Sequence, residues 1–288
     1  MRLNGGVRID LHTHTLVSDG TDTPTQLVRK AAEAGLDVIG LTDHDTFDGL
    51  PEARTAARET GIELLAGMEF STQKDGASVH LVAYGCDPHD ADLLDELARV
   101  RVGRSDRVPG MVARLTELGM PLTVEDVLAQ ASGTSLGRPH IADALVAKGY
   151  VATRDEAFRH WLYEGGPAYV DRYSTDLTRA IELIQRANGV AVLAHPWGRG
   201  RRDDLPEAYL AELVYEYRLD GVEVDHPDHD EDTRADLRAV ASRLGLLTTG
   251  SSDHHGLGKT RNPLGAGLTP PEVYDEIVRR ITARGGQA

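Results

Sequence analysis

The stretch Ile9-Asp10-Leu11-His12-Thr13-His14 places two histidines two residues apart at the end of a short apolar run. In an extended strand, residues i and i+2 project to the same face. We therefore expect His12 and His14 to aim both imidazole rings at one point, as two ligands of one metal ion do. A single His-x-His pair is weak evidence, because surface or core histidines are commoner than metal ligands.

The same arrangement, an apolar run beside an acid or a histidine, recurs along the chain. Because these runs alternate with helical patterns, the sequence predicts an α/β domain of parallel strands, whose carboxyl ends form one face. Strands are expected at 7–11, 38–41, 64–66, 79–83, 190–194, 222–224 and 246–249, and they accompany His12, His14, Asp19, His44, Glu69, His80, His195, Glu223, Asp253 and His255. His80 is the exception, because it lies at the start of its expected strand.

Helical patterns separate these strands. The clearest begins at Thr23-Pro24-Thr25-Gln26. There, Thr23 is expected as the N-cap, proline takes the first helical position, and Gln26 closes a capping box. Gly35 is expected to end this helix. Further helices are expected at 50–59, 177–187, 206–218, 232–244 and 271–284.

The strand signal disappears between about residues 102 and 173. Helical patterns at 107–118, 124–131, 139–148 and 154–163 replace it, separated by glycines and prolines. We therefore expect a barrel-like domain formed by residues 1–101 and 174–288. A small helical insertion, residues 102–173, is expected to cover the active site.

The composition restricts the classes of protein that are possible. The chain has 288 residues, 40% of them hydrophobic, a net charge of −15 and one cysteine, Cys86. These values are typical of a protein with a sizeable core, and no apolar run reaches the roughly 20 residues of a membrane span. The lone cysteine and the lack of a signal-peptide pattern favour the cytoplasm. The acidic balance argues against binding of long duplex nucleic acid, but it does not exclude a phosphorylated substrate.

The number of candidate ligands indicates more than one metal ion. Histidine and carboxylate are the ligands expected for zinc, manganese or iron, and six histidines with several acids are too many for one ion. Two-metal sites are common in phosphoester hydrolysis. Each histidine alone could equally be a surface or core residue, but their repeated placement at strand ends favours a multinuclear cluster.

These motifs resemble those of the PHP family, the polymerase-and-histidinol-phosphatase fold. The similarity rests on His12-Thr13-His14, Thr42-Asp43-His44 and Ser252-Asp253-His254-His255. The stretches Ser18-Asp19-Gly20 and Gly137-Arg138-Pro139-His140 resemble a branch of small, stand-alone phosphoesterases that includes nucleoside 3′,5′-bisphosphate phosphatases and 5′-to-3′ exoribonucleases. The resemblance implies a distorted seven-stranded, (β/α)7 TIM-like barrel and a trinuclear metal site.

The same resemblance implies a ligand set for two or three divalent ions of manganese, zinc or iron. The first ion would be held by His12, His14, Glu69 and Asp253, the second by Glu69, His80 and His195, and the third by Asp19, His44 and His255. Asp10 and Asp45 are candidates to orient metal-binding histidines, with ordinary strand-end acids as the alternative.

The expected chemistry is phosphoester hydrolysis by a hydroxide that bridges metal ions. Adjacent cations lower the pKa of a water, which then attacks phosphorus in line with the leaving oxygen. Glu69, Asp253 and His255 are expected as the catalytic residues. No serine or cysteine nucleophile is required.

Four residues outside the ligand set are expected to bind substrate: Arg138, His140, Lys259 and His229. Arg138 and His140 open an insertion helix, where a helix N-terminus and a guanidinium both favour a phosphate group. His229 is expected to face the pocket, with His226 outside it. The sequence leaves open the roles of His254 and of the arginine-rich loop at 199–202.

We therefore expect a metal-dependent phosphoesterase for a small nucleotide, such as a nucleoside 3′,5′-bisphosphate or the 5′ end of a short oligoribonucleotide. The alternatives are a phosphatase or cyclic phosphodiesterase for another small phosphate, such as a mononucleotide or sugar phosphate, or a non-catalytic metal-binding module. No membrane partner is expected. The sequence does not decide the leaving group, the metal or the oligomeric state.

Overall fold

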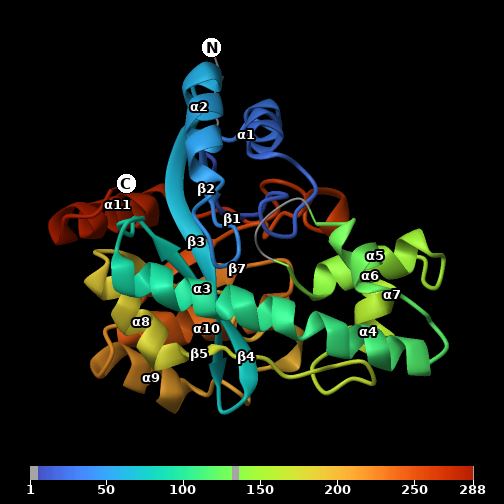
Figure 1. Ribbon diagram of the computed structural model, residues 1–288. Helices are drawn as coiled ribbons and strands as arrows, with labels where there is room; N and C mark the ends of the chain where they lie inside the picture. Colours follow the sequence, from blue (N-terminus) through green and yellow to red (C-terminus); the bar gives the residue numbers. More distant parts are fainter. Residues whose placement is uncertain (1–5, 132–135, 288) are drawn as a thin grey trace.

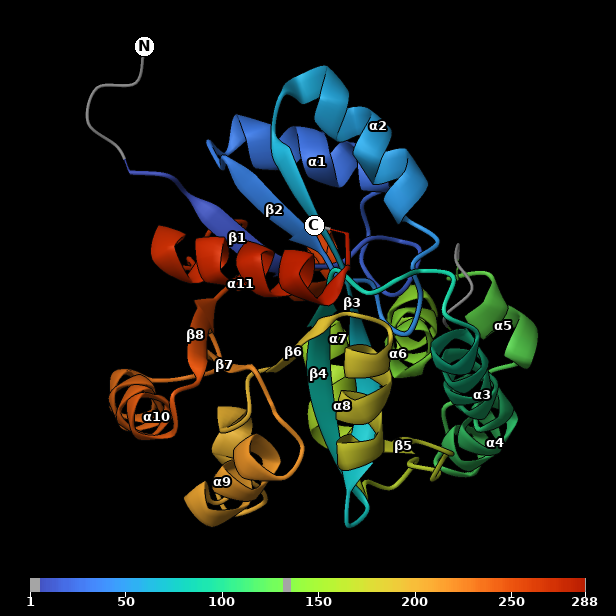
Figure 2. The ribbon, with the colours of Figure 1, turned by 90° about the vertical axis from the view of Figure 1, so that its left-hand side faces the viewer.

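A nearly closed barrel of seven strands forms the centre of the protein in the computed structural model, which describes residues 6–131 and 136–287. The strand order is β1 (Ile9–Thr13), β2 (Val38–Leu41), β3 (Glu63–Lys74), β4 (Ala77–Tyr84), β6 (Val190–Leu193), β7 (Gly221–Asp225) and β8 (Leu247–Gly250). The first and last strands approach one another just beyond β8, where the His14 backbone N–H donates to the His254 carbonyl at 2.9 Å. The expected barrel is confirmed (Figure 2).

One strand runs against the others, so the expectation of an all-parallel sheet is wrong. Strand β4 pairs antiparallel with both β3 and β6. The turn before it is Asp75-Gly76, and both residues have positive φ angles, 51° and 87°. An Asp-Gly pair in this conformation is the typical two-residue turn of a β-hairpin. The reversal brings the first half of β4, and with it His80, to the edge where the parallel strands end.

Strand β3 is much longer than the expected 64–66. Its first part pairs parallel with β2, and its second part, from Gly67 to Lys74, forms the hairpin with β4. A side chain at Gly67 would lie 2.8 Å from the Ala83 carbonyl, so glycine is required for the two strands to pair. A two-residue strand that the sequence did not predict, β5 (Thr175–Asp176), adds to the end of β3.

Helices cover the outside of the barrel: α1 (Pro24–Glu33), α2 (Leu50–Thr60), α8 (Leu177–Arg186), α9 (Glu207–Tyr215), α10 (Glu231–Leu244) and α11 (Pro271–Arg284) (Figure 2). The capping box at Thr23 is confirmed, because its side chain accepts from the Gln26 N–H at 3.1 Å and the Gln26 side chain accepts from the Thr23 N–H at 2.9 Å. Helix α11 packs Tyr274, Ile277 and Ile281 into a cluster with strand residues of the barrel.

The middle of the chain forms a group of helices beside the barrel: α3 (Ala91–Asp106), α4 (Val108–Glu117), α5 (Val124–Leu128), α6 (Arg138–Ala147), α7 (Arg154–Ala157) and the π-helix η1 (Phe158–Leu162) (Figure 1). The helices from α4 onward enclose a hydrophobic cluster of their own, from Val108 to Ala168, whereas the buried residues of α3 belong to a cluster with strand residues of the barrel. The sequence reasoning missed α3, which runs through residue 102. Its signals are the N-cap Asp90 and apolar residues at helical spacing, such as Leu93, Leu97 and Val100.

Among the described residues, no helix is both long and apolar enough to cross a membrane.

Candidate metal centre

The first group of polar side chains gathers around a point at the end of strand β1. His12 Nε2 and His14 Nε2 lie 3.0 Å apart and 3.3 and 3.2 Å from Glu69 Oε2. Asp253 Oδ1 completes the group, 3.7 and 3.4 Å from the same two nitrogens. Ligand atoms about 2.1 Å from a tetrahedral ion stand about 3.4 Å apart, so these four atoms have the spacing of a metal site.

The second group shares Glu69. Its Oε1 atom lies 2.8 Å from His80 Nδ1 and 3.3 Å from His195 Nε2, while its Oε2 atom lies 3.1 Å from His44 Nδ1. The carboxylate of Glu69 is buried, and each of its two oxygens lies close to histidine nitrogens. A carboxylate placed in this way can bridge two metal ions.

The third group lies on the other side of His14. Asp19 Oδ1 is 3.2 Å from His255 Nε2 and 3.8 Å from His14 Nδ1, and Asp19 Oδ2 is 3.7 Å from His44 Nε2. Potential ligand atoms of these four residues all lie within 4.8 Å of one another. His44 thus belongs by distance to both the second and the third group.

The chemistry of these donors fits divalent cations. The Nδ1 atoms of His14 and His44 are buried and have no hydrogen-bond partner among the described residues. Buried polar atoms without partners are costly, and a cation would satisfy nitrogen lone pairs aimed at carboxylates. Imidazole with carboxylate suits zinc, manganese and iron alike. The cluster is therefore a candidate site for divalent metal ions.

The pKa shifts of these histidines are consistent with a cation site. Burial lowers the pKa of His14, but hydrogen bonds to Asp253 and Glu69 outweigh it and raise the pKa to about 9. Burial and the neighbouring positive charge of His14 lower the pKa of His255 to about 4. The carboxylates thus hold a proton on His14, and a metal ion would displace that proton.

Three residues at the cluster have backbone angles that are unusual for side chains other than glycine. Asp45, His195 and Asp253 have φ angles of 56°, 29° and 51°. Such conformations cost free energy and are concentrated at functional sites. They turn the chain sharply just after strands β2, β6 and β8, which brings polar side chains back over the barrel.

Glu223 and His226 lie beside the first group, although the sequence reasoning gave them no role in it. Glu223 Oε1 accepts from His12 Nδ1 at 3.1 Å, and Oε2 accepts from the His195 backbone N–H at 3.0 Å. His226 Nε2 lies 3.3 Å from Asp253 Oδ2. His226 is buried beside this candidate ligand, and the signal that could have found both residues is the Val222-Glu223-Val224-Asp225-His226 strand end. It does not line the cavity over the cluster, in agreement with the expectation that it stays outside the pocket.

Asp10 and Asp45 do not orient histidines. Asp10 accepts from the backbone N–H groups of Ser252 and Gly265, at 3.0 and 2.8 Å, and so anchors the segment before Asp253. Asp45 accepts from the Ser71 N–H at 2.7 Å and lies 2.8 Å from Arg104 Nε. Asp43, the carboxylate of the Thr42-Asp43-His44 motif, accepts hydrogen bonds from Thr15 and Ser18 and so braces the loop that carries Asp19.

A cavity of about 640 Å³ opens over the cluster. The ligand candidates Asp19, His44, Glu69, His80, His195, Asp253 and His255 line one side, and the helical segment lines the other with several arginines. Of the residues expected to bind substrate, Arg138 and Lys259 line this cavity, and Lys259 contacts Asp253.

His140 and His229 are not among the residues that line the cavity. Both are buried: His140 Nδ1 accepts from the Gly137 N–H at 3.1 Å, and His229 Nδ1 donates to the Val224 carbonyl at 2.9 Å. These contacts hold local backbone, and they leave the expected binding roles without direct access to the cavity.

The structure shows the contacts of His254 and of the loop at 199–202, whose roles the sequence left open. His254 lies where the barrel closes, with Nδ1 donating to the Asn262 carbonyl at 2.8 Å. In the loop at 199–202, Arg201 contacts the Ser78 carbonyl and Glu164, both at 2.6 Å. Arg202 pairs with Asp236, and the side chain of Arg199 lies outside the described residues.

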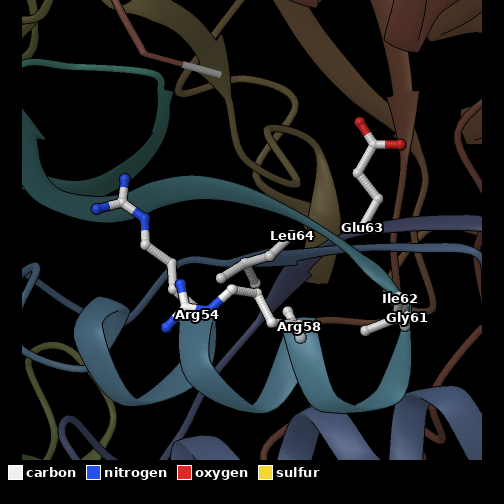
Figure 3. A pocket seen from close by; sticks show the side chains of 7 residues that line it. Arg54, Arg58, Gly61, Ile62, Glu63 and Leu64 are labelled. Atoms are coloured by element: carbon white, nitrogen blue, oxygen red, sulfur yellow. The ribbon is translucent and has the colours of Figure 1, made fainter.

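A second, open hollow lies elsewhere on the molecule, at the start of strand β3 (Figure 3). It measures about 420 Å³ and is lined by Arg54, Arg58, Glu63 and neighbouring residues of α2. No expected site residue lines it. The start of β3 is also the opposite end of the parallel strands from the histidine cluster.

Comparisons with known proteins agree with this geometry. A family model described as the PHP domain matches residues 10–123. The chain is 33% identical over 251 residues to a 5′-3′ exoribonuclease of Haemophilus influenzae, covering 86% of this chain and 90% of that protein. It is also 33% identical over 280 residues to a 3′,5′-nucleoside bisphosphate phosphatase of Chromobacterium violaceum, covering 96% and 97%.

A solved structure supports the same assignment. It is that of a Bifidobacterium adolescentis protein assigned as a metal-dependent phosphoesterase, with a TM-score of 0.90 and 38% identity, and the match covers 96% of this chain and 97% of that one. Identities above 30% over nearly the whole length, together with the histidine and carboxylate motifs, show to which family the chain belongs. The chain belongs to the PHP family.

Proposed function

We propose that the protein is a metal-dependent phosphoesterase that hydrolyses a phosphomonoester of a small nucleotide. The observation that carries the proposal is the cavity itself. One side carries imidazoles and carboxylates at metal-site spacing, and the facing side carries arginines. A site with room for cations on one side and fixed positive charge on the other is suited to a phosphorylated substrate.

Three ions are proposed, because the candidate ligands form three groups that share members. His12, His14, Glu69 and Asp253 would hold the first, Glu69, His80 and His195 the second, and Asp19, His44 and His255 the third. The shared position of Glu69 between two groups supports a bridging role. Manganese, zinc and iron all suit these donors.

When bound, the cations would acidify a water and neutralise charge on the phosphoryl oxygens. The protein's own groups have separate roles. Glu69, Asp253 and His255 would hold the ions, and Lys259, which contacts Asp253 at the cavity wall, would add positive charge beside the substrate's phosphoryl group. Arg138 presents its guanidinium to the same cavity from the first residue of helix α6.

The helical segment, residues 102–173, is proposed to act as the substrate-binding wall of the barrel domain. Its arginines Arg104, Arg138 and Arg154 line the cavity opposite the metal ligands. Arg154 also donates to the Asp19 carbonyl at 2.9 Å, so the helical segment directly contacts the loop that carries Asp19.

A nucleoside 3′,5′-bisphosphate or the 5′ end of a short oligoribonucleotide is the proposed substrate. The names of the two relatives support this choice, and a cavity of about 640 Å³ lies within the range of small-ligand pockets. We place the protein in the cytoplasm, in line with its single, buried cysteine, Cys86.

The test is a phosphate-release assay on chelator-treated protein before and after addition of Mn²⁺. The panel contains nucleoside bisphosphates, mononucleotides, cyclic phosphates, sugar phosphates and short 5′-phosphorylated RNAs. We expect metal-dependent release with preference for bisphosphates or RNA ends. Equal turnover of unrelated phosphomonoesters would contradict the nucleotide assignment, and no hydrolysis by metal-replete protein would favour a non-catalytic module.

A further inference from the structure

The third group of proposed metal ligands depends on two loops. Asp19 lies in the loop after β1 and His255 lies in the loop after β8, whereas His12 and Glu69 of the other groups lie within strands. Side chains on strands are held more precisely than side chains on loops. The geometry of the third group therefore depends on the contacts that hold these two loops together.

One side chain, Thr21, joins the two loops. Its hydroxyl oxygen accepts from the Leu257 N–H at 2.8 Å and lies 3.5 Å from the His255 carbonyl oxygen, to which it donates. Thr21 is two residues from Asp19 along the chain, and its contacts are at His255 and two residues beyond it. A displacement of this contact would therefore be passed to both loop ligands.

Glycine at position 256 is required for this contact. Gly256 has a φ of 62°, in the left-handed region that glycine adopts at no steric cost. The first side-chain carbon of any other residue would lie 2.1 Å from Thr21 Oγ1. The backbone of the second loop thus passes directly against the Thr21 hydroxyl, at a distance that only glycine permits.

Asp22 anchors the first loop at the same place. Its carboxylate contacts Lys30 of helix α1 at 2.6 Å, and its Oδ2 atom lies 3.7 Å from His254 Nε2. Its carbonyl accepts from the Leu16 N–H at 2.8 Å, which closes the loop that contains Asp19. The first loop is therefore fixed both to α1 and to the second loop.

These contacts lie outside the space for a substrate. Asp19 and His255 line the cavity, but Thr21, Asp22 and Gly256 are not among the described residues that do so. Thr21 is exposed on the surface. A change at Thr21 would therefore affect the reaction only through the ligands that the loops carry.

We propose that the contact between Thr21 and Gly256 sets the affinity of the third proposed metal group for its divalent cation. It does so by fixing the distance between Asp19 and His255, one on each loop. Contacts that orient metal ligands contribute to the affinity of a metal site. The proposal rests on the proposed function, because it concerns one of the three proposed ions, and it makes Thr21 a positioning residue.

The first test measures metal binding directly. Chelator-treated protein is dialysed against a series of free Mn²⁺ concentrations, and bound Mn²⁺ per chain is measured by elemental analysis. Thr21→Val keeps the shape of the side chain and removes the hydroxyl. We expect one ion to need about 3- to 10-fold more Mn²⁺, the value of one hydrogen bond, while the other ions bind as in the parent protein.

Two further variants make this titration specific. Thr21→Ser keeps the hydroxyl and should restore the parent's Mn²⁺ binding. The matched control is Thr55→Val, which removes an exposed hydroxyl from α2 and should leave Mn²⁺ binding unchanged. Mn²⁺ binding by Thr21→Val that equals the parent's, or an equal shift for every ion, would overturn the proposal.

A double-mutant cycle tests the contact itself. Gly256→Ala places a methyl group against the Thr21 hydroxyl and should weaken the same ion about 10-fold or more, in the range of a strained left-handed residue. In a Thr21→Ala background the hydroxyl is absent, so Gly256→Ala should cost less, because the backbone strain is common to both backgrounds and cancels. An equal cost in both backgrounds would show that the two residues do not act through one contact. If Gly256→Ala does not fold, the Thr21→Val titration decides alone.

The same measurements separate this proposal from the proposed function. A Mn²⁺ ion whose binding depends on Thr21, in a protein that hydrolyses no phosphoester, would contradict the proposed function alone. Metal-dependent phosphate release by a parent protein whose Mn²⁺ binding does not depend on Thr21 would contradict the positioning role alone.

Discussion

The two sides of the cavity carry side chains of opposite charge. On the barrel side, Glu69, Asp19 and Asp253 are buried against imidazoles, and every carboxylate lies near at least one histidine. On the helical side, Arg107 and Arg172 both line the cavity, and neither forms an ion pair within residues 6–131 and 136–287. The barrel thus collects negative groups and lone pairs that a cation would satisfy, and the helical segment collects positive groups that an anion would satisfy. This difference supports the proposed division of roles, in which the barrel side would hold cations and the helical side would bind the substrate.

The largest expected effect on activity comes from removing a candidate metal ligand on the barrel side of the cavity. His14→Ala removes the side chain whose Nε2 belongs to the first group and whose Nδ1 faces the third. We expect kcat/KM to fall by at least about 1,000-fold, because several kcal/mol of charge stabilisation by the ions would be lost. A phosphate-release assay measures the loss of activity, and elemental analysis measures the metal content per chain.

The matched control is His160→Ala, which removes an exposed histidine from η1. It should keep both activity and metal content. Full activity of His14→Ala with the parent's metal content would contradict the ligand assignment.

A smaller effect is expected from Glu223→Gln, which acts on the ligands through their supporting contacts. Glu223 accepts hydrogen bonds from His12 Nδ1 and from the His195 N–H, and a glutamine turns one accepting oxygen into a donor. Loss of such a supporting contact typically weakens metal affinity 10- to 100-fold. We expect the Mn²⁺ concentration for half-maximal activity to rise by that factor while kcat at saturating Mn²⁺ stays near the parent value.

Glu207→Gln is the control, because Glu207 is an exposed residue of α9 that pairs with Arg243 on the surface. A loss of kcat in Glu223→Gln that excess Mn²⁺ does not restore would show a role for Glu223 in the reaction itself.

The sequence predicted the barrel side far better than the helical side, for a physical reason. Each expected metal ligand lies close to an apolar strand, so a local pattern such as the one around His12 and His14 reports its position. Strand β2 was predicted with the observed bounds, 38–41. The direction of β4 was not predicted, although the Asp75-Gly76 turn carries a hairpin signal, and that direction explains why His80 reaches the cluster from the start of its strand.

The arginines that line the helical side of the cavity have no comparable signal in the sequence. Arg107 joins α3 to α4, Arg138 begins α6 and Arg172 lies between η1 and β5, so only the packing of the chain brings them together. The expectation that His229 faces the cavity was wrong for a related reason. His226 and His229 both follow β7, and the direction of each side chain depends on the backbone at the end of that strand, where the pairing register shifts between Glu223 and Asp225.

The smallest effect is expected where the two regions touch. Arg154, the first residue of α7, forms a paired contact with both carboxylate oxygens of Asp143, each at 2.5 Å, and donates to the Asp19 carbonyl at 2.9 Å. Arg154→Gln should therefore loosen the Asp19 loop without removing a ligand. We expect kcat/KM to fall about 3- to 10-fold, in the range of one hydrogen bond, and to recover partly at high Mn²⁺.

A double-mutant cycle separates this contact from a general loss of stability. Asp143→Asn weakens the same paired contact, so the combined variant should lose less activity than the product of the two single losses. Lys148→Gln, which removes an ion pair with Asp126 inside the helical segment, should leave activity unchanged. If Arg154→Gln and Asp143→Asn are instead independent, Asp143 does not hold Arg154 against the Asp19 loop, and the helical wall binds substrate without positioning the metal ligands.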